Sequence, residues 1–125
     1  MNQDGEGEMM TYAVWLVAVI HVAFAGAEIF RWPNVSKLLL GYDEGMAAKT
    51  AKLGLNQGAY NAFFAIVLLA VLLGAVPEGQ AEVLTIFCLA SLAAAGLVGL
   101  LTIRHWVFLI QLVPAAVALW LVLAN

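Results

Sequence analysis

The sequence predicts an all-α membrane protein whose four transmembrane helices form an up-and-down bundle. Of its 125 residues, 65% are hydrophobic and only 10% are charged, whereas a soluble domain carries about 25% charged residues. Four segments are long and apolar enough to cross a bilayer, because one helical crossing needs about 20 residues. The connections between them are short, so residues 1–125 are expected to form a single membrane domain.

The predicted spans cover about residues 10–31, 53–74, 82–104 and 105–124. The stretch before the first span has no Lys or Arg and no cleavage site of a secretory signal, so we expect this span to remain in the mature protein. Pro33 disfavours helical geometry at Trp32 and should end the first helix. The sequence VPEGQ predicts the turn before the third span, and a polar corner at Arg104 and His105 separates the last two.

The loop WPNVSKLLLGYDEGMAAK is more than a linker. It predicts a short helix in the membrane interface that Asn34 would cap and Gly41 would end. The face opposite its charged residue would carry Val35, Leu38 and Leu39. Asp43 is expected to cap a helical lead-in that runs from about Glu44 into the second span.

All basic residues fall on one side of the predicted bundle: Arg31, Lys37, Lys49, Lys52 and Arg104. By the positive-inside rule, the first and third connections face the cytoplasm and both termini face outward. We therefore expect a multi-pass protein of the inner (plasma) membrane, inserted in one orientation. Four Trp residues fit the aromatic belts of the two interfaces: Trp15 and Trp120 on the outer side, Trp32 and Trp106 on the inner side.

Seven polar side chains lie at membrane depth in this topology, and they form the candidate site for ligand binding or proton handling: His21, Glu28, Asn56, Gln57, Tyr60, Asn61 and Gln111. His21 and Glu28 are seven residues apart, which returns a helix to within about 20° of the same direction. In LNQGAYNAF, the angular positions predict that Gln57, Tyr60 and Asn61 share one inward face, with Asn56 diverging. All seven lie at overlapping depths, mostly in the cytoplasmic half, which predicts one shared cluster.

Structural roles compete with this interpretation. Interhelical hydrogen bonds of about 0.6 kcal/mol each would hold the bundle together without any ligand. His21 taken alone also fits a satisfied core histidine, and Glu28 fits a snorkelling side chain paired with Arg31 or Lys52. A carboxylate within a membrane span is nevertheless a functional candidate by default, because it costs about 2.5–3.5 kcal/mol at the bilayer centre. Seven polar groups at one depth exceed what helix association requires, so we favour a pocket.

Other positions in the spans predict packing roles. Ser91, Ala95 and Gly99 repeat at four-residue spacing and predict a small-residue stripe for helix packing. Pro114 should kink the fourth helix beside Gln111, because proline removes the hydrogen bond to a carbonyl four residues earlier. Cys88 has no partner for a disulfide and should act as a small buried hydrophobe.

Three motifs resemble a widespread family of small four-span bacterial membrane proteins of unknown function. They are the His21 to Glu28 spacing, the NQGAYN stretch of residues 56–61, and the pattern of Gln111, Pro114 and Ala115. The resemblance covers nearly the whole chain, and NQGxYN is its most specific part. It implies the four-helix architecture and marks the site candidates, but it implies no activity.

The polar cluster predicts a pocket for a small amphiphilic or lipophilic molecule. In a proton-coupled transporter or exchanger, Glu28 would alternate between proton and substrate. Four helices hardly enclose a path across the membrane, so transport predicts a parallel homo-oligomer.

Two alternatives stay open, and with them the question of whether the protein is an enzyme. In an intramembrane acid–base enzyme such as an isomerase, His21 or Glu28 would move the proton. The groups that stabilise developing charge would then be Tyr60, Asn56, Asn61 or Gln111. The third class is a structural accessory subunit. No metal site is expected, because His21 and His105 differ in depth, and no cofactor is implied. Membrane lipid is the expected surrounding, and a net charge of −3 without a further basic patch argues against nucleic acid.

Overall fold

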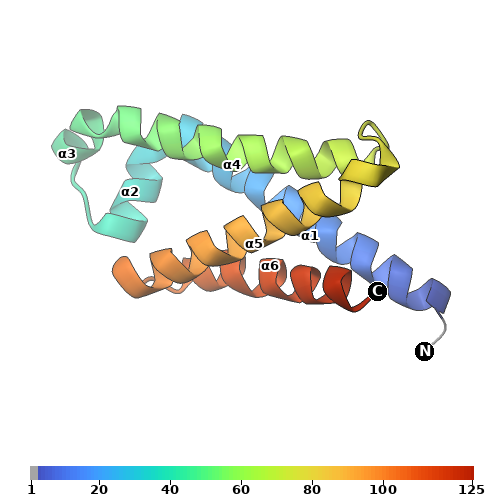
Figure 1. Ribbon diagram of the computed structural model, residues 1–125. Coiled ribbons are helices and arrows are strands. Elements are labelled where there is room, and N and C mark those ends of the chain that lie inside the picture. Colours follow the sequence, from blue (N-terminus) through green and yellow to red (C-terminus); the bar gives the residue numbers. More distant parts are fainter. Residues whose placement is uncertain (1–2) are drawn as a thin grey trace.

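The computed structural model describes residues 3–125, which form six helices and, within that range, no strand. The helices are α1 (Gln3–Phe30), α2 (Trp32–Leu40), α3 (Glu44–Lys49), α4 (Ala51–Leu72), α5 (Glu78–Thr102) and α6 (Val107–Ala124). Four of them, α1, α4, α5 and α6, are long and apolar enough to cross a membrane. The predicted all-α fold with four spans is therefore confirmed. Figure 1 shows the four long helices running along one another, with the N- and C-termini at the same end.

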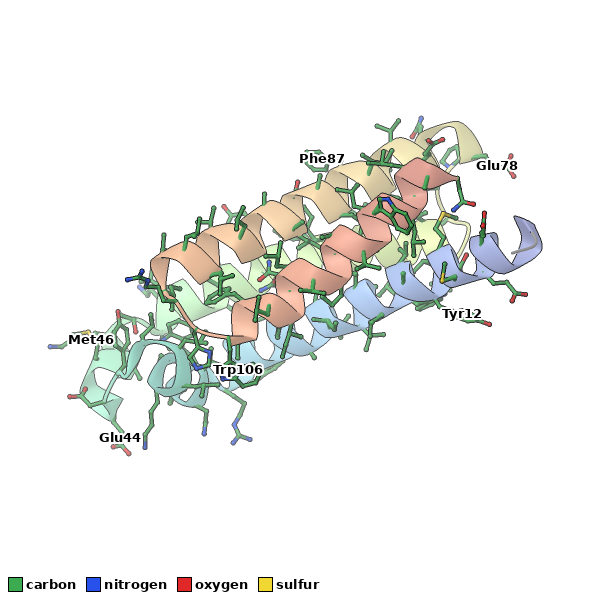
Figure 2. The ribbon with its side chains drawn as sticks, turned by 90° about the horizontal axis from the view of Figure 1, so that it is seen from below. Tyr12, Glu44, Met46, Glu78, Phe87 and Trp106 are labelled. Atoms are coloured by element: carbon green, nitrogen blue, oxygen red, sulfur yellow. The ribbon has the colours of Figure 1, made fainter. Side chains whose placement is uncertain are left out.

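The two ends of the bundle differ in charge. The end opposite the termini carries α2, α3 and the α5–α6 corner, and with them all five basic residues; we call it the basic end. We call the other the terminal end. In Figure 2, Glu44, Met46 and Trp106 lie at the basic end, and Tyr12 and Glu78 at the terminal end. The four long helices thus run between the basic end and the terminal end, which carries the α4–α5 turn.

The helices pack as two antiparallel pairs. The most extensive contacts join α1 with α4 and α5 with α6, while α1 also contacts α6 and α4 contacts α5. The core between the pairs contains residues with no exposed surface: Val17, Ala18, Leu68, Leu89, Ala115 and Ala118. Cys88 lies in the same core with 2% of its surface exposed, as predicted for a small buried hydrophobe. Each span otherwise exposes apolar side chains, as a lipid-facing surface requires.

Glycines set the spacing within each helix pair. A Cβ at Gly58 of α4 would lie 2.5 Å from Cγ1 of Ile29 and 3.0 Å from the carbonyl oxygen of Ala25. A Cβ at Gly96 of α5 would lie 2.8 Å from the backbone nitrogen of Leu112 in α6. Small residues allow such backbone approach in membranes. Neither contact would survive an added side chain without movement of a helix.

The predicted stripe of Ser91, Ala95 and Gly99 is wrong in its register. Ala95 is exposed and Ser91 is half-buried, and only Gly99 lies in the α5–α6 interface, against the ring of Phe108. The small residues that α6 approaches are Gly96 and Gly99, three positions apart. Both spacings are compatible with one helix face, so the repeat alone did not identify which face meets a neighbour.

The short helix α2 begins earlier than predicted. Arg31 is its N-cap, so Asn34 lies within the helix, and Pro33 occupies the first turn, where its missing amide hydrogen costs nothing. Gly41 ends the helix with φ 68°, as predicted. Asp43 caps α3, because its Oδ1 accepts a hydrogen bond of 2.8 Å from the amide of Met46. The predicted continuous lead-in is interrupted at Thr50, where α3 stops and α4 begins.

Trp32 is not part of an interfacial belt. It is 9% exposed, its ring lies against Gly54, and its Nε1–H donates a hydrogen bond of 3.0 Å to Oγ1 of Thr50. The prediction that Trp32 belongs to an aromatic belt was wrong, because the absence of a side chain at Gly54 leaves room for the indole ring inside the protein. Trp32 therefore fastens α2 to the start of α4.

The α5–α6 connection is longer than the predicted one, because α5 already ends at Thr102. Arg104 has φ 62°, in the left-handed region, and α6 starts at Val107 instead of His105. The amide of Val107 donates a hydrogen bond of 3.2 Å to Nδ1 of His105, so the imidazole satisfies a free donor at the helix start. α6 then continues through Pro114 without interruption.

Candidate functional site

The centre of the site is a hydrogen bond between two spans. Nδ2 of Asn61 in α4 donates a bond of 2.7 Å to Oε2 of Glu28 in α1, and both residues are partly buried. The sequence predicted that these two residues belong to one polar cluster of seven, and it did not predict this particular pair. A bond to a carboxylate in a low-dielectric setting is stronger than a neutral one, and it offsets part of the cost of burial.

Local packing explains why these two residues meet. On α4, Gly58 and Asn61 are three residues apart and both face α1, while Gly54 lies against Trp32 of α2. Because Gly58 lies directly against Ile29 and the Ala25 carbonyl, the two backbones are close enough for a short amide to reach the carboxylate. Gly58 therefore positions the hydrogen bond that Asn61 forms about one turn further along α4.

A cavity of about 220 Å³ adjoins this hydrogen bond at the basic end. Its walls come from α1, α2, α4 and α6, and its lining is mostly apolar. The lining residues are Phe24, Ala27, Glu28, Val35, Leu38, Leu39, Asn61, Val107, Phe108, Ile110 and Gln111. Glu28 is the only one of them that carries a charged side chain. The apolar face predicted for the loop helix thus borders this cavity.

Gln111 is the third polar group of the cavity wall. Its Nε2 donates a hydrogen bond of 3.3 Å to the carbonyl oxygen of Leu92, which ties α6 to α5. Gln111 lines the same cavity as Glu28 and Asn61. Of the seven predicted site residues, these three meet at the cavity.

His21 lies deeper in the bundle and does not line the cavity. It is 1% exposed, its Nδ1 lies 2.8 Å from the carbonyl oxygen of Val17, and its Nε2 is buried without a partner among the described residues. Phe24 separates it from the cavity, since the two rings meet edge to face with centroids 5.6 Å apart. The hydrogen bond to the Val17 carbonyl satisfies one of the two imidazole nitrogens and fixes the orientation of the ring.

The predicted inward face of α4 was too wide. Asn56, Gln57 and Tyr60 are exposed, and only Asn61 of the four polar residues points into the protein. Angular spacing relates these residues to one another but does not say which direction faces a neighbour. The pair Gly54 and Gly58 does, because neighbours pack where the backbone is bare: α1 at Gly58 and Trp32 of α2 at Gly54. That four-residue glycine spacing is the signal which would have identified the inner face.

The sequence also did not identify the apolar half of the cavity wall. Phe24 and Ala27 lie one turn and one residue from Glu28, and Val107 and Phe108 start α6. Apolar residues in an apolar span carry no distinguishing signal, so nothing in the sequence separates them from lipid-facing neighbours.

Two other cavities contain none of the seven predicted site residues. One of about 550 Å³ at the terminal end includes Glu78, Glu82 and Asn125, and one of about 750 Å³ lies among the loop residues around Tyr42 at the basic end. Glu78 and Glu82 are exposed. The cavity beside Glu28 and Asn61 is the one that joins a partly buried carboxylate to an apolar lining.

Four spanning helices around a packed core define a multi-pass integral membrane protein. A family model described as "Protein of unknown function (DUF1304)" matches residues 15–123. The chain therefore belongs to this family, in agreement with the resemblance noted for its motifs. No curated protein and no solved structure matches the chain.

Proposed function

We propose that the protein binds a small amphiphilic molecule within the membrane, in the cavity at the basic end. The observation that carries this proposal is the Glu28–Asn61 hydrogen bond in the wall of an otherwise apolar cavity. Ligand sites are mostly apolar with a few placed polar groups that orient the ligand. A bond that served only to join α1 and α4 would not need an adjoining space.

The lining indicates the chemistry of the ligand. No Lys or Arg is among the lining residues, whereas one carboxylate and two amides are. A carboxylate away from water gains most from a hydrogen-bond donor or a cation. We therefore expect a polar end that donates, such as an amine or hydroxyl group, on a short apolar body. The volume of about 220 Å³ is below the usual range of roughly 300–1,000 Å³ for drug-sized ligands, so the body must be small.

Proton-coupled exchange remains part of this proposal through Glu28, which can hold either a proton or a cationic ligand. Passage to the terminal end would require rearrangement, because Val17, Leu68 and Leu89 close the core beyond the cavity. The enzyme alternative has less support. Tyr60 and Asn56 are exposed and His21 is outside the lining, which leaves Glu28 as the single acid–base group there.

Binding can be measured with octylamine, octanol and octanoate, added to purified protein and followed by native mass spectrometry. We expect octylamine and octanol to bind, and octanoate to bind at least about tenfold more weakly because its charge repels Glu28. Glu28→Gln should weaken octylamine binding by about tenfold or more, and Ala27→Leu should abolish binding by filling the cavity. Glu82→Gln, which removes an exposed carboxylate at the terminal end, is the matched control.

Equal affinities for the amine and the carboxylate would contradict the assigned ligand chemistry. Binding that Ala27→Leu leaves unchanged would contradict the assigned cavity. In both cases the protein's helicity, measured by circular dichroism, must match that of the wild type.

A further inference from the structure

The outward side of α4 carries an ordered seam at the basic end that none of the other five described helices covers. Leu53, Asn56, Tyr60 and Phe63 follow one another at intervals of three, four and three residues, and all four are exposed. The exposed fractions of Leu53, Tyr60 and Phe63 are 61%, 56% and 62%. Alternating three- and four-residue spacing is the pattern by which two helices cross at a small angle.

Two polar side chains on this seam lie within a helix long enough to span the membrane. Lipid offers no hydrogen bonds, so polar groups in spans usually face protein or water. Asn61, one residue beyond Tyr60, has such a partner in Glu28. Asn56 and Tyr60 point away from that interface, to a side of α4 where residues 3–125 supply no helix.

We propose that the seam formed by Leu53, Asn56, Tyr60 and Phe63 binds the same seam of a second copy, giving a parallel dimer. A two-fold axis along the membrane normal keeps every residue at its own depth, so Asn56 meets Asn56 and Tyr60 meets Tyr60 of the second copy. A carboxamide both donates and accepts, so it is complementary to itself. The one-sided distribution of the basic residues fixes both copies in the same orientation.

An asparagine in such a seam selects the register and the partner. In soluble parallel coiled coils a single Asn at a seam position fixes register and number of strands. Leu53 and Phe63 would supply van der Waals contacts on either side of the polar pair. The proposal concerns the outer face of α4 and does not depend on the cavity, which lies on the other side of the helix between α1, α2 and α6.

Cysteine cross-linking in vesicles of phosphatidylethanolamine and phosphatidylglycerol tests the seam with the full chain. The seam variants are Leu53→Cys and Phe63→Cys, and the controls are Leu55→Cys and Ile66→Cys, which are 55% and 60% exposed on another side of α4. The native Cys88 is buried and should not react. We expect disulfide-linked dimers from both seam variants and essentially none from either control. Equal cross-linking of seam and control positions would overturn the proposal.

The role of the amide is tested by energy transfer between labelled copies as the protein is diluted in lipid. Asn56→Leu should require about tenfold more protein per lipid to reach half-dimerisation, because the pair of hydrogen bonds is lost. Gln57→Leu removes an exposed amide beside the seam and should leave dimerisation unchanged within about twofold. A wild-type chain that stays monomeric at every dilution, or an Asn56→Leu variant that dimerises as well as the wild type, would overturn the proposal.

Discussion

Asn61 and Glu28 are 33 positions apart in the sequence, and a 2.7 Å hydrogen bond joins their side chains across the α1–α4 interface. The bond links two antiparallel spans at one depth. Its acceptor, Glu28, is the only residue of the cavity lining with a charged side chain. Experiments can separate the contribution of this hydrogen bond to stability from its role in ligand binding. If the bond is merely structural, substitutions at Glu28 or Asn61 that keep the two helices together will not affect ligand binding.

Asn61→Leu is expected to destabilise the protein by about 1–3 kcal/mol, because it leaves the Glu28 carboxyl partly buried without its donor. The double variant Glu28→Leu/Asn61→Leu should lose less than the sum of the two single variants. Equilibrium unfolding in mixed micelles measures all three. Strict additivity would mean that the bond contributes no coupling energy.

Gly58→Ala is expected to lower the free energy of unfolding by about 1–3 kcal/mol, because its Cβ would collide with Ile29 and the Ala25 carbonyl. Gly26→Ala is the matched control: nothing lies within 4 Å of its added Cβ, and alanine favours a helix. The same unfolding measurement serves both. Equal losses at the two positions would contradict a close approach at Gly58.

Trp32→Phe keeps a ring against Gly54 but removes the Nε1–H that bonds to Thr50. We expect a loss of about 0.5–1.5 kcal/mol, the usual net worth of one hydrogen bond. Trp106→Phe should change little, since Trp106 is 62% exposed. A thermal shift assay in detergent compares the two, and a larger effect at Trp106 would refute the fastening role of Trp32.

His21→Leu should be close to neutral, within about 1 kcal/mol, because one imidazole nitrogen is already buried without a partner and leucine fills a similar volume. The thermal shift of this variant checks the expectation. A loss of several kcal/mol would mean that Nε2 has a partner on which stability depends.

The orientation predicted from charge can be tested by labelling with a membrane-impermeant maleimide. Cysteines at the exposed positions Gly79 and Lys37 lie at the terminal and basic ends, while native Cys88 is buried. From outside intact cells, Gly79→Cys should react and Lys37→Cys should react only after permeabilisation. The reverse pattern would invert the topology.

The sequence predicted the four spans because hydropathy over about 20 residues is a strong signal. From depth along each helix it also predicted one cluster of seven polar residues, of which Glu28, Asn61 and Gln111 lie at the cavity. The inward face that it predicted for α4 was too wide, because depth says nothing about the rotation of a helix. The missing information was the close contact of Gly58 with α1 and of Gly54 with Trp32 of α2. Trp32 illustrates the same difficulty. From the sequence, an aromatic residue near a membrane interface could contact lipid or pack against a glycine inside the protein, and Trp32 does the latter.

The walls of the cavity differ in stiffness. On the carboxylate side, Gly58 brings two backbones into contact, so no rotamer change can widen that side. The rest of the wall consists of side chains of α6 and of α2, a nine-residue helix that ends at Gly41. A series of ligands with growing apolar bodies should therefore keep one fixed position for the polar end, while adaptation to length occurs at the side chains of α2 and α6.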